Sequence, residues 1–159
     1  MKLKQLITTL LAIVFCTCLL AGCGNDKQNI SDEKDKISIT DSLGRQVVLD
    51  KPVSRAVVAN AYNTELINAI GAIDDVVGVD FNIYQDQEGF KNKFTKDMVI
   101  GKSQRELNYE KIIELKPEVL ILTSNGAWQD AEAKLSPFGI KVINVDAYYT
   151  DKFEDNLLL

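Results

Sequence analysis

Aromatic side chains and one arginine gather in the segments that follow the predicted strands. The arginine is Arg105, and the aromatic residues are Tyr62, Phe81, Tyr84, Trp128, Tyr148 and Tyr149. Flat aromatic faces beside a cation suit a bulky, planar or anionic organic molecule. We take Tyr62, Tyr84, Arg105 and Trp128 as candidate ligand-binding residues. Trp128 could equally pack at a helix start, and Arg105 could be a solvated surface arginine.

The residue types that the commonest catalytic chemistry needs are missing. The sequence contains no histidine, which excludes Ser-His-Asp and Cys-His catalysis and the commonest metal ligand. It also lacks the Gly-x-Ser-x-Gly motif of hydrolases. Asp86-Gln87-Glu88-Gly89 imitates part of a calcium loop, but Tyr84 and Thr95 would take carboxylate positions of that loop. We therefore expect solvated turn acids, no metal site and no enzyme.

The N-terminal segment predicts export. Lys2 and Lys4 precede an apolar run from Leu6 to Leu20, which is shorter than the roughly 20 residues of a bilayer-spanning helix. Leu20-Ala21-Gly22-Cys23 resembles the lipobox of bacterial lipoproteins, in which cleavage leaves a lipid-bearing cysteine. We predict a signal peptide at residues 1–22, lipidation of Cys23 and an extracytoplasmic location at the cell membrane. The alternative is an ordinary secretory signal.

Composition narrows the range of partners. The 159 residues include 18 Lys or Arg and 23 Asp or Glu, a formal net charge of −5. Loss of Lys2 and Lys4 with the signal makes the mature chain more acidic, which argues against a nucleic-acid partner. Cys23 would be the one remaining cysteine, so no internal disulfide can form. Residues 23–36 are polar and charged, and they predict a flexible tether.

Ordered structure is expected from Ile37. Residues 37–40 and 46–49 flank the turn Asp41-Ser42-Leu43-Gly44 and predict a β-hairpin. Further strands are predicted at residues 55–59, 75–79, 118–123 and 141–145. Their strand–helix–strand order indicates two βαβ units and a parallel sheet, whose ligands would lie beyond the carboxyl ends of the strands.

Capping and breaking residues delimit the helices. Asn63 or Thr64 caps a helix that runs to Ile70 and stops at Gly71. Asn108 begins a second helix, which Pro117 ends, and a third covers residues 128–135. Residues 82–97 are ambiguous, a helix or turns around Phe90 and Phe94, and residues 101–108 are expected to form a loop.

Four segments occur in an order that is typical of one family. They are DSLGRQVVLDKPVSRAVVAN, NTELINAIGAIDDVVGVD, GKSQRELNYEKIIELKPEVLILTSNG and FGIKVINVDAYYT. Behind a lipobox, they resemble the helical-backbone class of ABC-transporter solute-binding proteins, which capture ferric siderophores, haem and cobalamin. The resemblance implies an α/β fold of two lobes joined by a long helix. Residues 37–150 would form the N-terminal ligand-binding lobe, mostly a parallel sheet with flanking helices and an N-terminal hairpin. Residues 151–159 would begin the interlobe helix of a truncated chain.

The resemblance also implies a function. The protein would capture an iron chelate, haem or cobalamin and deliver it to a membrane permease, acting as a monomer without a cofactor of its own. Glu110, within Asn108-Tyr109-Glu110, resembles the family's exposed acid that docks against permease arginines. An acid in the first turn of a helix is also favoured by the helix dipole, which needs no partner. The alternative function is a single-lobe surface interaction lipoprotein without a role in transport.

Overall fold

The computed structural model describes residues 36–147, apart from residues 87 and 91. Several predictions fall outside these residues. They concern the signal peptide at 1–22, lipidated Cys23, the tether up to residue 35, Tyr148, Tyr149 and the interlobe helix at 151–159.

The described chain begins with the predicted hairpin. Strand β1 (Ile37–Thr40) pairs antiparallel with β2 (Gln46–Leu49), and Ile37 lies opposite Leu49. Half-buried and exposed residues alternate along both strands, as the period of two in the sequence requires. The Asp41 carboxylate closes the turn by accepting the backbone N–H groups of Leu43 and Arg45, both at 3.0 Å. The hairpin prediction is confirmed.

Four parallel strands form the central sheet, in the order β4-β3-β7-β8. They are β3 (Ala56–Val58), β4 (Val76–Val79), β7 (Val119–Leu122) and β8 (Lys141–Asn144). Strand β3 pairs in parallel with both β4 and β7, and β7 pairs in parallel with β8. The continuous apolar sequence of β7 is explained by its central place, because a parallel strand is covered on both faces. The predicted parallel sheet is confirmed.

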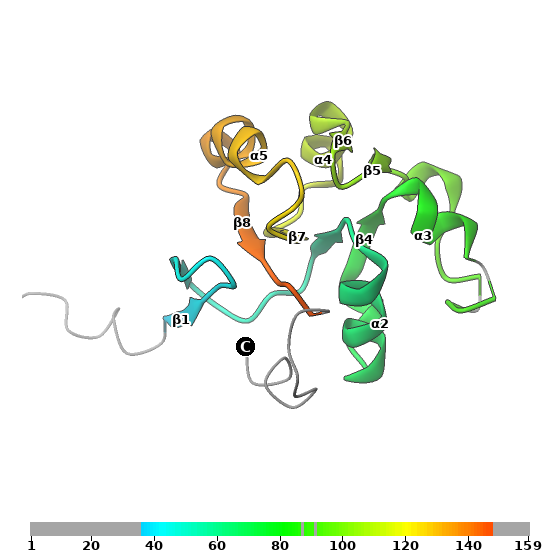
Figure 1. Ribbon diagram of the computed structural model, residues 1–159, viewed down its shortest axis with the longest axis horizontal. Helices are drawn as coiled ribbons and strands as arrows, with labels where there is room; N and C mark the ends of the chain where they lie inside the picture. The colour runs from blue at the N-terminus through cyan, green and yellow to red at the C-terminus, as the bar shows by residue number, and fades with distance from the viewer. Residues whose placement is uncertain (1–35, 87, 91, 148–159) are drawn as a thin grey trace, which may run out of the picture. The chain divides into compact units, whose positions relative to one another are not determined.

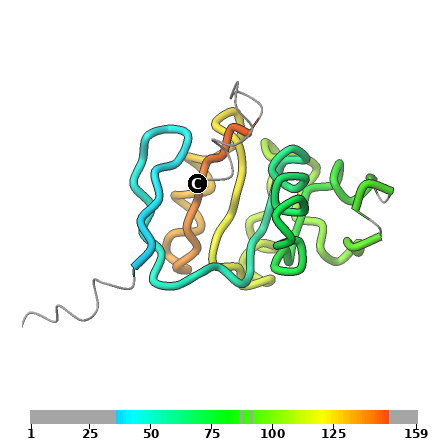
Figure 2. The backbone as a smooth tube through the Cα atoms, turned by 90° about the horizontal axis from the view of Figure 1, so that it is seen from below, coloured from blue at the N-terminus to red at the C-terminus, as the bar shows by residue number. Residues whose placement is uncertain are grey.

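Helices cover both faces of this sheet. They are α2 (Ala61–Ala69), α3 (Phe81–Gln85), α4 (Tyr109–Leu115) and α5 (Trp128–Leu135). Figure 1 shows α4 and α5 on one side of the sheet, and α2 and the β1–β2 hairpin on the other. Figure 2 views the molecule from this second side, with the hairpin towards the left and α2 towards the right.

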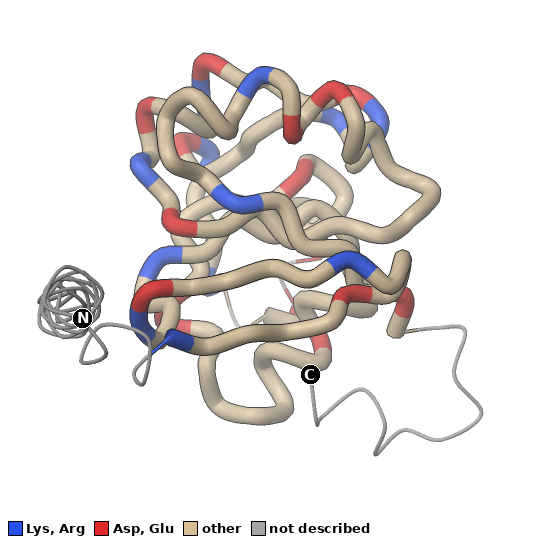
Figure 3. The backbone as a smooth tube through the Cα atoms, turned by 90° about the vertical axis from the view of Figure 1, so that its left-hand side faces the viewer, with Lys and Arg blue, Asp and Glu red and all other residues tan. Residues whose placement is uncertain are grey.

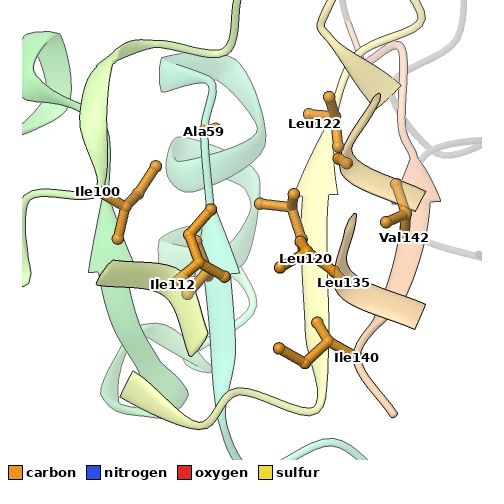
Figure 4. Close-up of a cluster of buried hydrophobic side chains, with 10 residues drawn as sticks. Ala59, Ile100, Ile112, Leu120, Leu122, Leu135, Ile140 and Val142 are labelled. Atoms are coloured by element: carbon orange, nitrogen blue, oxygen red, sulfur yellow. The ribbon is translucent and has the colours of Figure 1, made fainter. Parts of the chain in front are cut away.

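The sheet separates two hydrophobic cores, because successive residues of a strand point to opposite faces. In β3, Val57 belongs to the core under α4 and α5, whereas Val58 belongs to the core under α2 and the hairpin. Figure 4 shows the first core, with Ala59, Ile100, Ile112, Leu120, Leu122, Leu135, Ile140 and Val142 labelled. A fully buried aliphatic side chain contributes about 1.5–3 kcal/mol. The two cores therefore hold the strands, and with them the segments at the strand ends, in place.

The start of α2 differs from the prediction. Asn60 is the cap, and its side chain accepts the N–H of Asn63 at 3.3 Å. Asn63 and Thr64 lie inside the helix and are buried, and the Thr64 hydroxyl donates to the Asn60 carbonyl at 2.9 Å. Three residues that could cap a helix, Asn60, Asn63 and Thr64, stand within five positions, so the local sequence is ambiguous. Asn63 and Thr64 are buried inside the helix, which leaves Asn60 as the cap.

A second hairpin replaces the predicted loop at residues 101–108. Strands β5 (Gly101–Ser103) and β6 (Glu106–Leu107) pair antiparallel. The ambiguous residues 82–97 contain most of α3, followed by turns that bury Phe90 and Phe94 with their ring centroids 5.5 Å apart. Within the described part of the chain, no helix is long and apolar enough to cross a membrane.

Candidate functional site

The carboxyl ends of the four parallel strands lie at one edge of the sheet, which we call the strand-end rim. It consists of residues 59–62, 80–84, 123–127 and 144–147. The chain leaves β3 into α2 on one face of the sheet, and leaves β7 into α5 on the other face. Strands β3 and β7 are neighbours, so the direction of winding changes between their ends. Ligands of open α/β sheets bind at such a switch point.

Polar residues close each strand end. Asp80 follows β4 and caps α3 by accepting the N–H groups of Asn82 and Ile83 at 2.9 and 3.2 Å. Burial raises the pKa of the Asp80 carboxyl, despite these two hydrogen bonds. After β8, the Asp146 carboxylate accepts the backbone N–H and the hydroxyl of Ser124 at 2.8 and 2.6 Å. These bonds hold the ends of β7 and β8 together and make the rim a defined surface.

Arg105 is positioned at this rim by the β5–β6 hairpin. The neighbouring Gln104 side chain accepts the Thr123 N–H at 3.1 Å and the Thr123 hydroxyl at 2.7 Å. The Gln104 carbonyl accepts the Ala127 N–H at 2.9 Å, so the hairpin turn is clamped to the segment that follows β7. Arg105 donates its Nε–H to the Asn125 carbonyl at 3.0 Å and is exposed. It makes no ion pair with any described residue.

Two of the exposed aromatic residues lie on the rim. Tyr62 is 57% exposed in the first turn of α2, directly after β3. Phe81 is 41% exposed at the start of α3, and its ring centroid lies 6.1 Å from that of Tyr84. Tyr84 is half-buried and packs against the core under α2. Phe81 was absent from the candidate set, although its place directly after the capping residue Asp80 is a usable signal.

Trp128 is held by packing contacts. It is half-buried at the start of α5 and packs on the core under that helix. The Arg45 guanidinium lies over its ring, 4.6 Å from the centroid, and Arg45 also pairs with Glu132 at 2.6 Å. These are the contacts that the packing alternative requires. The roles of Tyr62, Tyr84, Arg105 and Trp128 in ligand binding stay predictions.

Glu110 lies apart from these residues, in the first turn of α4. Asn108 caps this helix as predicted, because its side chain accepts the Lys111 N–H at 3.0 Å. Lys111 pairs with Glu114 at 3.1 Å, whereas the exposed Glu110 forms no ion pair among the residues that the structure describes. Its role in docking stays a prediction.

The described residues show no basic stripe on the face in Figure 3 and no group of metal ligands. Positions of Lys and Arg alternate with those of Asp and Glu over the face shown in Figure 3, so this face carries no continuous basic stripe. In residues 36–147, excluding 87 and 91, no three acidic or cysteine side chains are grouped to hold a metal ion. Asp86 instead caps a turn by accepting the Gly89 N–H at 3.1 Å.

Comparisons with known proteins agree on one family. A family model described as periplasmic binding protein matches residues 57–158. The chain is 33% identical over 143 residues to YvrC of Bacillus subtilis strain 168, named as an uncharacterized ABC transporter substrate-binding lipoprotein. That alignment covers 85% of this chain and 43% of the relative.

Solved structures share the fold at low identity. The molybdate periplasmic binding protein MolA of Haemophilus influenzae aligns with a TM-score of 0.61 at 22% identity, over 76% of this chain and 37% of that chain. The iron uptake substrate-binding protein PiuA of Streptococcus pneumoniae gives 0.56 at 19%, over 70% and 37%. The haem binding protein HmuT gives 0.55 at 21%, over 70% and 34%. This chain thus spans less than half the length of the proteins it matches.

Proposed function

Since the chain belongs to the periplasmic binding protein family, we propose that it forms the first lobe of an extracytoplasmic receptor of an ABC importer. The receptor captures an iron chelate, haem or cobalamin and delivers it to the membrane permease. A lipid on Cys23 anchors it, as the lipoprotein name of the Bacillus relative supports. The family binds solutes and does not transform them, in agreement with the expectation that the chain is not an enzyme.

The arrangement of the strand-end rim carries this proposal. Arg105 is fixed beside the end of β7, and the exposed rings of Tyr62 and Phe81 follow β3 and β4 at the same edge. A cation and flat apolar surfaces suit an organic ligand that carries negative charge. Without histidine, the chain is poorly equipped to hold a bare transition-metal ion, which favours a chelate. A second lobe would close the other side of the ligand.

A ligand screen tests the proposal. We expect the full-length protein to be stabilised by one member of a panel of haemin, a ferric hydroxamate, a ferric catecholate and cyanocobalamin, with molybdate as an inorganic comparison. A ligand at 100 times its Kd stabilises by about 2.7 kcal/mol, which raises the melting temperature by several degrees. The absence of stabilisation by every chelate and by haemin and cobalamin would contradict the proposed substrate class.

The substitution Arg105→Gln tests whether Arg105 binds the ligand or is only a solvated surface residue. We expect the affinity for the stabilising ligand to fall about tenfold, because a charge-assisted hydrogen bond is lost. Lys102→Gln is the matched control, since it removes a cation from the same hairpin whose charge already pairs with Glu106 at 3.2 Å. Isothermal titration of both variants measures the difference. Equal losses in the two variants would remove Arg105 from the site.

Glu110→Arg tests the docking role. We expect uptake by cells that carry the full-length receptor to fall about tenfold, because reversing an interface charge introduces repulsion. Ligand affinity in solution is expected to stay unchanged, because Glu110 is exposed on α4 and lies outside the strand-end rim. Glu114→Arg, on the same helix, is the control. Unchanged uptake in Glu110→Arg would exclude docking through this residue.

A further inference from the structure

A groove beside Glu110 is lined by two charged side chains, Glu110 and Lys134, that form no ion pair with any described residue. It is lined by Leu107, Asn108, Tyr109, Glu110 and Lys134, has a volume of about 540 Å³ and lies between the start of α4 and the exposed side of α5. We call it the α4–α5 groove. Two other acids on these helices form ion pairs, Glu114 with Lys111 at 3.1 Å and Glu132 with Arg45 at 2.6 Å, whereas Asp130 in the first turn of α5 forms none with a described residue.

One of the residues that line the α4–α5 groove is aromatic. Tyr109 is half-buried and packs on the core under α4 and α5. The Lys134 ammonium lies 4.3 Å from the centroid of this ring, so a cation–π contact holds it beside the groove. Burial and the nearby Asp130 raise the pKa of the Tyr109 hydroxyl, which is therefore a neutral hydrogen-bond donor and acceptor. Over the described residues, neither Glu110 nor Lys134 forms an ion pair.

The groove therefore offers one acid from α4 and one base from α5 beside an aromatic ring. We propose that the permease docks on the whole α4–α5 groove, with a basic side chain against Glu110 and an acidic side chain against Lys134. This inference rests on the proposed function and extends it, because docking through Glu110 alone needs only a basic partner. Glu110 and Lys134 carry opposite charges, so a permease surface with the complementary pair can bind in one register only. A permease with an acid facing Glu110 or a base facing Lys134 would be repelled. Lys134 is then a residue that determines which permease the receptor recognises.

Substitution of Lys134 tests the inference in the full-length receptor. We expect Lys134→Glu to weaken binding to the cognate importer, reconstituted in lipid nanodiscs, by about tenfold. Lys134→Gln is expected to weaken it about threefold, because it removes an attraction without adding a repulsion. The control is Lys141→Glu, a reversal of an exposed lysine at the start of β8, which does not line the groove and should change binding less than twofold.

The outcomes separate this inference from the proposed function. A tenfold loss in Lys134→Glu, with ligand affinity and melting temperature unchanged, supports docking on the whole groove. Normal docking of Lys134→Glu beside impaired docking of Glu110→Arg would overturn the inference and leave docking through Glu110 intact. If Lys134→Glu and Lys141→Glu weaken docking equally, the effect is one of net charge and the inference is wrong.

Discussion

Replacing Gly101 by alanine is expected to lower the free energy of unfolding by about 3 kcal/mol. Gly101 has a φ of +147°, a conformation that side-chain-bearing residues rarely adopt. A Cβ atom there would lie 2.2 Å from the Glu106 carbonyl oxygen and 2.9 Å from the Leu107 Cα. Both atoms are backbone, so relief requires the β5–β6 hairpin to open. Urea unfolding followed by circular dichroism measures the loss.

Gly44→Ala is the matched control. Gly44 also has a positive φ, +74°, but a Cβ atom there would meet nothing within 4 Å. Its replacement is expected to cost about 1 kcal/mol, the conformational penalty alone. Equal costs at the two positions would show that the hairpin tolerates the extra atom. Because the same hairpin carries Arg105, we also expect Gly101→Ala to weaken ligand binding, whereas Gly44→Ala should not.

Local signals in the sequence were sufficient for most of the fold. The alternation along residues 37–40 and 46–49 specified the first hairpin, because one face of each strand is half-buried. The apolar residues Val119–Leu122 within the predicted strand 118–123 specified a central strand. Asn108 and Pro117 marked both ends of α4 within one or two residues. Each of these signals concerns residues close together in the chain, so no tertiary information was needed.

The second hairpin could not be predicted in the same way. Gly101–Ser103 and Glu106–Leu107 are too short and too polar to show a period of two. They are held instead by contacts with distant residues, above all the Gln104 bonds to Thr123 and Ala127. The hairpin also depends on the positive φ of Gly101. A glycine in the sequence does not by itself reveal this conformation.

In the candidate site, too, the positions of the segments could be predicted from the sequence, whereas contacts between distant residues could not. The order of strands and helices predicted which segments would meet at one edge, and Tyr62 and Arg105 do lie at that edge, while their role in binding stays a prediction. Exposure of the side chains could not be predicted, since Phe81 and Tyr84 both lie in the short helix α3, but Phe81 is 41% exposed and Tyr84 is half-buried. The Arg45–Trp128 contact joins residues from the first hairpin and from α5, and no local pattern relates them.

Asp41 connects the first hairpin to the sheet. Its buried carboxylate accepts the Arg45 Nε–H and Nη2–H groups at 2.9 and 2.7 Å, and the Asn144 N–H at 3.3 Å. Next to it, Ser42 donates its backbone N–H to the Asn144 carbonyl at 2.8 Å. The Ser42 hydroxyl accepts the Asp146 N–H at 2.8 Å. The turn thus forms hydrogen bonds with the backbone of Asn144 and Asp146, where β8 ends at the rim.

We expect Asp41→Ala to lower the free energy of unfolding by about 3 kcal/mol, because it leaves the half-buried Arg45 guanidinium with Glu132 as its ion-pair partner and removes the acceptor of several buried or half-buried N–H groups. Asp50→Ala removes an exposed acid that pairs with Lys36 at 3.7 Å and should cost less than about 0.5 kcal/mol. Burial raises the pKa of Asp41, but hydrogen bonds from Arg45 outweigh it and hold this pKa below the ordinary value of 3.8. A lowered pKa stabilises the folded state above pH 3.8, and this contribution is lost as the pH falls through the folded-state value. The gap between wild type and Asp41→Ala in urea unfolding should therefore narrow in acid, and a constant gap would show that the charge of Asp41 is not what holds the hairpin.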